Sequence, residues 1–352
     1  MKKVFTLASA IILSSIPLLS TAVESITAQE EQTVVVYSNT LFDEAREARV
    51  TELAKEAGFK LEVVAAPGGD TYNRVLAEKD DPQADVVIGL DEANWLNLQE
   101  EIALHDFEPV WAENIPEAKL LGSGQFFPFA ESYIFGLYNP DNVSEEEIPK
   151  RLEELGESDN WKEKYRIPED LAGSTHQKIL LTILMQYPDE NGDLGISEEG
   201  WQKVENYINN GYQIREDEDH FALLNEGTLL FDYHHASGTS VAIDENKDYN
   251  IKPIDPEYGV FTMTEEIGIL DKGKDHDYTA AEGFVNWFGS DEIQKTLAEE
   301  FGFVPLTDVA KEGMNDTMKT LLEQVTPMEV DWDLYRENVD AWVEKLELDY
   351  MP

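Results

Sequence analysis

The feature of this sequence that most restricts its fold is an alternation of short β-branched runs with helical stretches. The runs at 33–38 (TVVVYS), 61–65 and 84–89 (ADVVIG) predict strands. Helical periodicity over 41–58 and 71–79 separates them. Successive parallel strands need a crossover between them, and this crossover is usually a helix. The alternation therefore predicts an α/β fold with a parallel sheet that helices cover on both faces.

Binding groups in such a sheet lie at the carboxyl ends of the strands, where the loops meet at one edge. The residues that follow the three predicted strands are Tyr37, Ser38 and Asn39, then Gly69 and Asp70, and then Asp91, Glu92 and Trp95. We expect these loops to converge on one crevice that binds a ligand.

Two long extended runs lie far apart in the chain, one over 126–138 and the other over 258–270. A chain that forms two lobes must leave one lobe and return to it, and two such runs would provide the crossover strands. We expect lobe 1 to contain residues 33–133 plus 258–308, and lobe 2 to contain residues 134–257 plus 309–352.

The N-terminal segment has the layout of a secretory signal peptide. Lys2 and Lys3 precede an apolar run, and cleavage after Ala28 would remove residues 1–28. The run also approaches the roughly 20 residues that span a bilayer, so an uncleaved membrane anchor is the alternative. We expect a mature chain that is secreted across the inner membrane, works in the periplasm or at the cell surface, and does not insert into the membrane.

Acidic residues greatly outnumber basic ones. The chain has 73 Asp and Glu against 26 Lys and Arg, a formal net charge of −47. Such a surface repels nucleic acid, because phosphate contacts need clustered Lys and Arg. The acids extend along the whole chain, which favours solvation in salty or alkaline surroundings. The chain has no cysteine, which excludes disulfides, thiolate metal sites and a lipid-bearing cysteine.

Motifs for catalysis or for cofactors are missing. The sequence has no G-x-S-x-G, H-E-x-x-H, Walker or G-x-G-x-x-G motif, so we expect neither an enzyme nor a cofactor. Of the six histidines only His234 and His235 are adjacent. The acidic run 189–193 lacks the glycine and glutamate of a calcium loop, and we interpret it as a surface loop before a helix capped by Ser197.

Several acidic side chains lie near predicted strand ends or crossovers. They are Asp91, Glu131, Asp232, and Glu265 or Glu266. The nearby bases are Arg74 and Lys178, one turn into helices. Burying unpaired carboxylates is costly and a positive ligand offsets that cost, so the crevice would favour a cation. The alternative is that these acids belong to a solvated acidic surface. Ser174 and Thr175 precede a helix, where they would bind an anionic group or cap the helix.

Six blocks of the sequence, in order, resemble a known family. They are TVVVYS (33–38), PQADVVIGLDEANW (82–95), FPFAESYIFGLYNP (127–140), NEGTLLFDYHHASG (225–238), AEGFVNWFGSDEIQ (281–294) and NVDAWVEKLELDY (338–350). In these blocks the chain resembles the extracellular solute-binding proteins of ABC importers, in the branch that contains ferric-ion-binding and thiamine-binding proteins. The resemblance implies a two-lobed type II periplasmic-binding-protein fold. Each lobe would be a mostly parallel sheet flanked by helices, with two crossover strands joining the lobes and closing like a hinge.

The resemblance also implies a thiamine-type contact. Asp91, in Gly89-Leu90-Asp91, is similar to an acidic ligand contact of thiamine-binding proteins, and Tyr233 is similar to their tyrosine. Their cleft tryptophans are not matched, because Leu41-Phe42 and Gly302-Phe303 stand at those places. An aromatic cage for an organic cation is therefore only partly supplied.

Ferric-binding relatives use paired tyrosines where this chain reads Asp232-Tyr233-His234-His235. The tyrosine pair is missing, so no firm metal site is implied. If the ligand is ferric ion, Tyr233, His234 and His235 would bind it.

We therefore expect the substrate-binding receptor of an ABC-type importer. It would capture a small cation between two lobes and deliver it to the permease subunits, with a thiamine-like compound preferred over ferric ion. We expect a monomer. The alternative, from a different class, is a secreted hydrolase that uses the crevice carboxylates and His234 or His235.

Overall fold

The structure, a computed structural model, describes residues 31–120 and 124–351. The predicted signal peptide, residues 1–28, lies outside the described residues. Within the described part of the chain, no helix has both the length and the apolar character that crossing a membrane requires.

The first three strands form the parallel arrangement that the sequence predicts. β1 (Gln32–Ser38) lies between β2 (Phe59–Ala65) and β3 (Val86–Asp91) and pairs with both in parallel. The crossovers are α1 (Glu44–Glu56) and α2 (Gly68–Ala77). They are helical because an Asp43 cap begins α1 and because α2 places Tyr72 and Val75 on one buried face.

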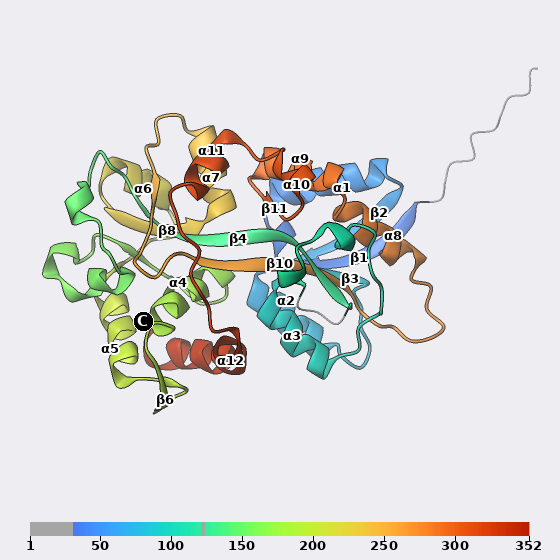
Figure 1. Cartoon of the computed structure of the whole chain (residues 1–352), viewed down its shortest axis with the longest axis horizontal. Helices are drawn as coiled ribbons and strands as arrows, with labels where there is room; N and C mark the ends of the chain where they lie inside the picture. Colours follow the sequence, from blue (N-terminus) through green and yellow to red (C-terminus); the bar gives the residue numbers. More distant parts are fainter. Residues whose placement is uncertain (1–30, 121–123, 352) are drawn as a thin grey trace, which may run out of the picture. The chain divides into compact units, whose positions relative to one another are not determined.

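Two long strands connect the two ends of this unit. β4 (Phe126–Tyr138) and β10 (Phe261–Ile269) run side by side and antiparallel through the middle of Figure 1. β10 also pairs with β3, so one continuous sheet includes both the parallel strands and the crossover strands. They are antiparallel because the chain leaves β1–β3 along β4 and returns along β10.

The far half of β4 pairs with further strands. Its antiparallel partners there are β8 (Phe231–His235) and β9 (Lys252–Ile254), and β11 (Val304–Pro305) pairs with the near half. A separate parallel pair consists of β5 (Arg166–Ile167) and β7 (Tyr212–Gln213), and β6 (Pro188–Asp193) follows α4. The parallel pairing that we predicted thus holds at β1–β3, whereas the crossover strands add antiparallel pairs that the residue pattern does not reveal.

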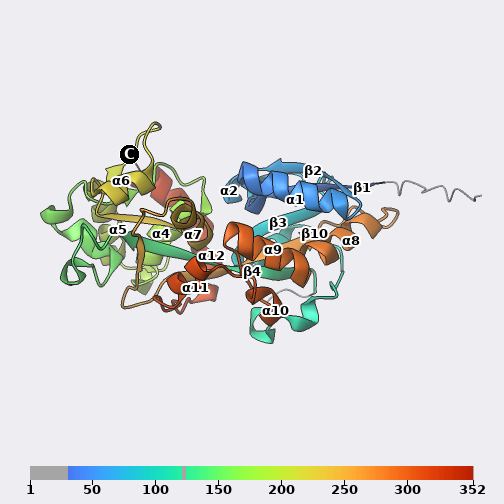
Figure 2. The same ribbon diagram turned by 90° about the horizontal axis from the view of Figure 1, so that it is seen from above.

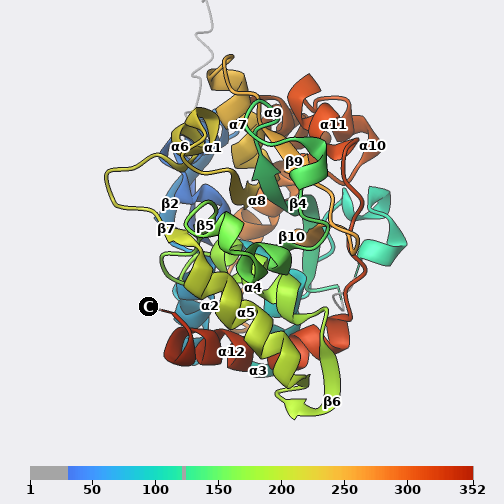
Figure 3. The ribbon, with the colours of Figure 1, turned by 90° about the vertical axis from the view of Figure 1, so that its left-hand side faces the viewer.

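Helices gather around both ends of the long strands (Figures 1 and 2). Near β1–β3 they are α3 (Glu92–Glu101), α8 (Thr279–Phe288), α9 (Asp291–Phe301) and α10 (Asp308–Lys311). Near β8 they are α4 (Ser174–Leu184), α5 (Glu198–Asn210), α6 (His220–Glu226), α7 (Ala236–Glu245), α11 (Asp316–Leu322) and α12 (Trp332–Asp349). Figure 3 looks onto α4 and α5, which pack against each other. Short 3₁₀ helices span Thr40–Phe42, Ala112–Asn114, Glu117–Lys119, Glu145–Glu147, Leu152–Glu157 and Asp159–Trp161.

The apolar core is divided in the same way. Two clusters, which include Phe284 and Trp95, draw all their buried members from 34–130 and 267–306. Two others, which include Leu180 and Met318, gather around α4, α5, α11 and α12. Buried apolar area is the main favourable contribution to folding, so each end of the long strands is stabilised by its own packing.

Gly89 fixes the contact between β3 and the loop after β1. Its φ is +96°, and a Cβ there would lie 1.9 Å from Thr40 Oγ1 and 2.6 Å from Asn39 Oδ1. Only glycine adopts this backbone without strain and leaves room for those side chains. Gly89 therefore allows Asn39 to lie beside the carboxyl end of β3.

Candidate functional site

A crevice lies where β1–β3 face α4 and α12. It consists of two cavities of about 430 Å³ each, which share Asn39, Gly68, Gly89, Ala172 and Ser174. Cavities of this volume suit a small-molecule ligand. We call them the acidic cavity and the histidine cavity after the side chains that line them.

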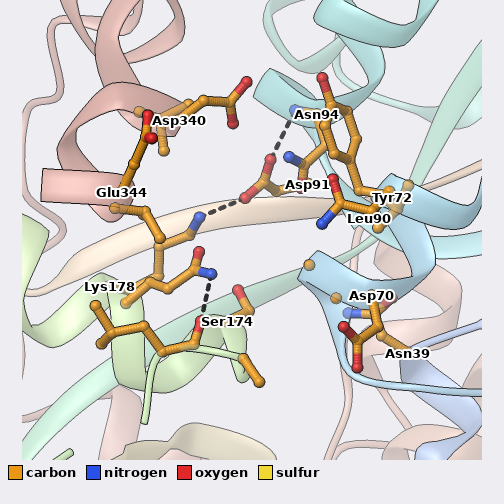
Figure 4. Close-up of a pocket in the computed structure, with 18 of the residues that line it drawn as sticks. Asn39, Asp70, Tyr72, Leu90, Asp91, Asn94, Ser174, Lys178, Asp340 and Glu344 are labelled. Atoms are coloured by element: carbon orange, nitrogen blue, oxygen red, sulfur yellow. Dashed lines mark hydrogen bonds and ion pairs between the residues drawn. The ribbon is translucent and has the colours of Figure 1, made fainter. Parts of the chain in front are cut away.

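The acidic cavity is shown in Figure 4. Asp70 comes from α2 on one side, and Asp340 and Glu344 come from α12 on the other. Asp91 and Lys178 lie between them at the floor. The remaining polar side chains of the lining are those of Tyr72, Asn73, Asn94, Gln177 and Glu347, together with the shared Asn39 and Ser174.

The histidine cavity adjoins the acidic cavity. It is lined by Arg46, Thr175, His176, His234 and His235, among others. Its outer part continues into a cavity of about 1030 Å³. Phe42, 57% exposed, lines both the histidine cavity and this outer cavity.

Local structure explains why these residues meet. The first turns of α2 and α4 border the crevice at Gly68 and Ser174, and His235 caps α7 by accepting the Gly238 N–H at 3.0 Å. Residues at the start of a helix lie where a strand or loop ends, so three separate segments deliver their polar residues to one place.

Several of the residues that the sequence singled out line this crevice. Asn39, Gly69, Asp70, Asp91 and Ser174 line the acidic cavity. Asn39, Ser174, Thr175, His234 and His235 line the histidine cavity. Glu265 lines the histidine cavity too, where it accepts a hydrogen bond from Thr40 Oγ1 at 2.7 Å.

Four other residues from the expected loops lie away from the crevice. The Tyr37 hydroxyl donates to Glu78 at 3.0 Å, and Ser38 is fully buried. Glu92 and Trp95 are not in a loop, because Asp91 accepts the Asn94 N–H at 2.9 Å and begins α3 there. The helical turn directs Trp95 inward, where it stacks on Phe126 at 5.4 Å between ring centroids.

Arg74, one of the two bases expected near the crevice, also lies outside it. Its guanidinium covers the Tyr37 ring at 4.4 Å and pairs with Glu78 at 3.1 Å. Of the two, only Lys178 lines the acidic cavity.

Asp232 and Tyr233 lie behind the histidine cavity rather than on its wall. Asp232 is 5% exposed, with His220 Nδ1 at 2.6 Å and Arg166 Nη1 at 3.7 Å. Tyr233 is 1% exposed, and its ring packs under the Arg166 guanidinium at 4.9 Å and against His176. Both side chains therefore belong to the packed interior.

Glu131 lies near the crevice but in a different setting. It forms an ion pair with Lys119 at 2.8 Å and lines a small separate cavity together with Glu265. Glu266 is 1% exposed and lines neither cavity.

The sequence reading missed two contributions to the crevice. Arg46, on α1, lines the histidine cavity and donates from Nη1 to the Thr40 carbonyl at 2.8 Å. Asp340 and Glu344 come from α12, the last helix of the chain. Their spacing of four residues, opposite the buried Trp342, was a signal of one acidic helix face.

Burial controls the charge of the titratable groups in the crevice. Burial and then Asp340 raise the pKa of Tyr72 to about 12, so its hydroxyl stays protonated. Burial, with Arg46 as the next cause, lowers the pKa of His235 to about 3. Burial and then His235 hold the pKa of His234 well below its usual value. Both imidazoles are thus uncharged at neutral pH.

A second group of acids lies beneath the floor. Glu92 is 4% exposed and accepts the Thr264 N–H at 2.9 Å, and Glu266 accepts from Thr264 Oγ1 at 2.7 Å. Burial, followed by the nearby Asp91, raises the pKa of Glu92 to about 7. Burial and then Glu92 raise the pKa of Glu266 well above its usual value.

Within residues 31–120 and 124–351, no group of three or more His, Asp or Glu side chains is placed to hold a metal ion. If the ligand were ferric ion, we expected Tyr233, His234 and His235 to bind it. The ring of Tyr233 instead packs against the Arg166 guanidinium.

Comparison with known sequences identifies the family. The profile of the family described as "Bacterial extracellular solute-binding protein" matches residues 48–323. The chain belongs to the bacterial extracellular solute-binding proteins. A relative from Sinorhizobium fredii, described as "Probable ABC transporter periplasmic-binding protein y4fP", is 28% identical over 304 residues, which cover 86% of this solute-binding protein and 83% of the relative. This family is a class of solute-binding transport proteins, which is not a class of enzymes.

Solved structures show the same type II fold. Iron-bound HitA from Pseudomonas aeruginosa has a TM-score of 0.71 and 15% identity, and covers 90% of this solute-binding protein and 100% of HitA. A periplasmic thiamin binding protein has a TM-score of 0.69 and 18% identity over 91% of this chain and 96% of its own. The periplasmic binding protein P5PA has a TM-score of 0.71 and 16% identity, and the match covers 92% of this chain and 100% of P5PA.

Proposed function

We propose that this solute-binding protein carries a small organic cation, bound in the acidic cavity. The observation that supports this is the charge of the lining. Asp70, Asp340 and Glu344 have no hydrogen-bond or ion-pair partner among the described residues. Lys178 is the one base that the described part of the chain contributes to that lining, and Asp91 already neutralises it. A solute with a positive group would offset the remaining negative charge.

An organic cation fits the crevice better than ferric ion does. Ferric-binding and thiamin-binding proteins both occur among the similar structures, and both ligands are positively charged. In this chain the Arg166 guanidinium packs on the ring of Tyr233, and a second cation beside it would be repelled. The acidic cavity instead offers separate carboxylates on α2 and α12, which suit a larger, delocalised or extended positive group.

We also propose that the crevice closes by movement of two lobes. Lobe 1 would comprise residues 33–133 plus 258–308, and lobe 2 residues 134–257 plus 309–352. Two of the four apolar clusters lie wholly within the lobe 1 ranges, which supports a separate lobe there. The other two consist mainly of lobe 2 residues and also include Ala93, Phe261 and Val304 from the lobe 1 ranges. The hinge would lie in β4 and β10, which pass between the two groups of elements.

The biological setting that we propose follows from the family. The mature chain would be exported, act as a monomer in the periplasm or at the cell surface, and dock on the permease subunits of its importer. A hydrolase using His234 or His235 has no support from the comparisons.

A thermal-shift screen of the purified protein tests the ligand proposal. The panel contains thiamine, choline, putrescine and spermidine as cations, ferric citrate as a metal source, and phosphonates as anions. A ligand that binds only the folded chain raises the unfolding midpoint, by about 2.7 kcal/mol of stability at a concentration of 100 Kd. We expect at least one organic cation to give this shift without being consumed.

Variants locate the response in the crevice. Asp340→Asn and Glu344→Gln should each weaken binding of the responding cation by roughly tenfold, about 1.4 kcal/mol. Glu337→Gln is the matched control, because Glu337 is exposed on the same helix and does not line the acidic cavity. The proposal is wrong if only phosphonates or ferric citrate shift the midpoint, or if the control weakens binding as much as the crevice variants do.

A further inference from the structure

The floor of the acidic cavity contains a lysine that is almost fully enclosed. Lys178 Nζ lies 2.7 Å from Asp91 Oδ2, and both side chains are 3% exposed. The dashed line between them in Figure 4 passes between α4 and the end of β3. A buried ion pair with this little solvent is strongly coupled, because removal of either partner leaves an uncompensated charge.

Both partners already make contacts within the protein. Asp91 Oδ1 accepts the Asn94 N–H at 2.9 Å while Oδ2 binds the lysine. Lys178 also donates to the Tyr335 hydroxyl, and its ammonium lies 5.1 Å from the centroid of the Tyr335 ring. Three elements, β3, α4 and α12, are therefore joined at this one ammonium.

The surroundings keep this lysine charged. The acids that face it are Asp91 directly, with Glu92 and Asp340 nearby. Burial alone would lower the pKa of Lys178, but Asp91 and Tyr335 more than offset burial, so its pKa is raised. The ammonium is therefore a charged part of the crevice floor at neutral pH.

We propose that Lys178 is a specificity-determining residue, an internal ammonium that occupies the deepest carboxylate of the crevice and keeps the solute's positive group away from Asp91. This inference rests on the proposed function in one respect, that the solute is a cation. The solute's positive group is then left to the outer carboxylates of Asp70, Asp340 and Glu344. Asp91 contributes to binding by holding Lys178 in place.

Deletion of the lysine side chain should create a new ammonium site. Lys178→Ala removes a group that propylammonium matches in length and charge, and leaves Asp91 without its cation. Propylammonium should therefore bind to this variant and raise its unfolding midpoint in a saturable way, at least tenfold more tightly than it binds to the wild-type protein. Propanol, which has the same length but no charge, should have no such effect.

Two further variants test whether the Asp91 carboxylate is the group that binds propylammonium. In Lys178→Ala/Asp91→Asn the charge of the acceptor is gone, so the response to propylammonium should disappear. Lys203→Ala is the matched control, because Lys203 also pairs with an acid, Glu157, but does not line the crevice. If Lys178→Ala does not fold alone, refolding yield with propylammonium against propanol gives the same readout.

The result that overturns the inference is an equal response of wild-type and Lys178→Ala protein to propylammonium, or a response that survives Asp91→Asn. Because this test uses no physiological solute, its failure leaves the outcome of the cation screen unaffected. A failed screen with a positive propylammonium response would in turn reject only the proposed solute class.

Discussion

At the scale of single residues, the most unusual feature is the set of buried carboxylates beneath the crevice. Glu92 and Glu266 both bind Thr264 on β10, next to the irregular register between Glu265 and Ile267. Two enclosed acids so close together cannot both ionise without large cost. The strand that joins the two groups of elements therefore contains a site that responds to protons.

The pH dependence of stability should reveal this site. The pKa of Glu92 is about 7 in the folded chain against an ordinary 4.5, so between these pH values the folded chain holds a proton that the unfolded chain has released. Stability is therefore lost as pH rises from about 4.5 to 7. Glu92→Gln removes the part of this loss that comes from Glu92, and at pH 8 it should be more stable than the wild type by about 3 kcal/mol.

Urea unfolding at pH 4 and pH 8 measures this difference. At pH 4 the two proteins should be nearly equal, because Glu92 is then protonated in both states. Glu56→Gln, an exposed position on α1, should show no difference at either pH. A Glu92→Gln variant that is less stable than the wild type at pH 8 would contradict the assignment.

At the scale of elements, α12 has two roles that depend on opposite faces. Tyr335, Val339, Trp342 and Leu346 are buried against the cluster around α4, whereas Asp340 and Glu344 line the acidic cavity. Packing on one face thus fixes the position of the carboxylates on the other.

This division can be tested with two leucines that lie two residues apart. Leu346 is 0% exposed and Leu348 is 76% exposed. Leu346→Ala should lower the free energy of unfolding by about 2–5 kcal/mol, because it removes buried apolar atoms and leaves a cavity. Leu348→Ala should change it by less than about 0.5 kcal/mol. Equal effects in urea unfolding would mean that α12 is not packed as described.

The element scale also shows what the sequence could and could not predict. β1–β3 and the two long strands were readable because their runs of apolar residues have a clear period and clear ends. The starts of α3 and α7 could not be predicted in this way, because each helix follows a strand without an intervening turn. Asp91 ends β3 and caps α3, and His235 ends β8 and caps α7.

The residues of the candidate site were also predictable only where local sequence patterns fix their positions. Asn39, Asp70 and Ser174 were predicted because each follows a strand or precedes a helix, and such positions are fixed by local structure. Asp340 and Glu344 lie far from them in sequence, and only the packing of α12 brings them to the crevice. Tyr233 and Trp95 looked suitable from their position alone, but the sequence does not show which side chain turns inward.

At the scale of the whole molecule, the dominant property is the formal charge of −47. Like charges at this density repel one another and oppose the compact state. The Debye length falls from about 10 Å at 0.1 M salt to about 3 Å at 1 M, so added salt weakens this repulsion.

Stability should therefore increase with ionic strength. We expect the unfolding midpoint to rise between about 0.02 and about 1 M NaCl, mostly in the first few tenths molar, where screening changes fastest. Potassium chloride should have a similar effect at the same ionic strength if screening is the cause. A midpoint that falls with both salts would mean that attractive surface pairs, such as Arg49 with Glu300, outweigh the repulsion.

One exposed ring offers a practical use of this architecture. Phe42 stands at the mouth of the crevice with 57% of its surface in water, and the chain contains no cysteine at all. A thiol introduced at that position would be unique, so a polarity-sensitive dye attached there would report on any guest that enters. The protein can thus be turned into an optical sensor for its own cargo by a single labelled substitution.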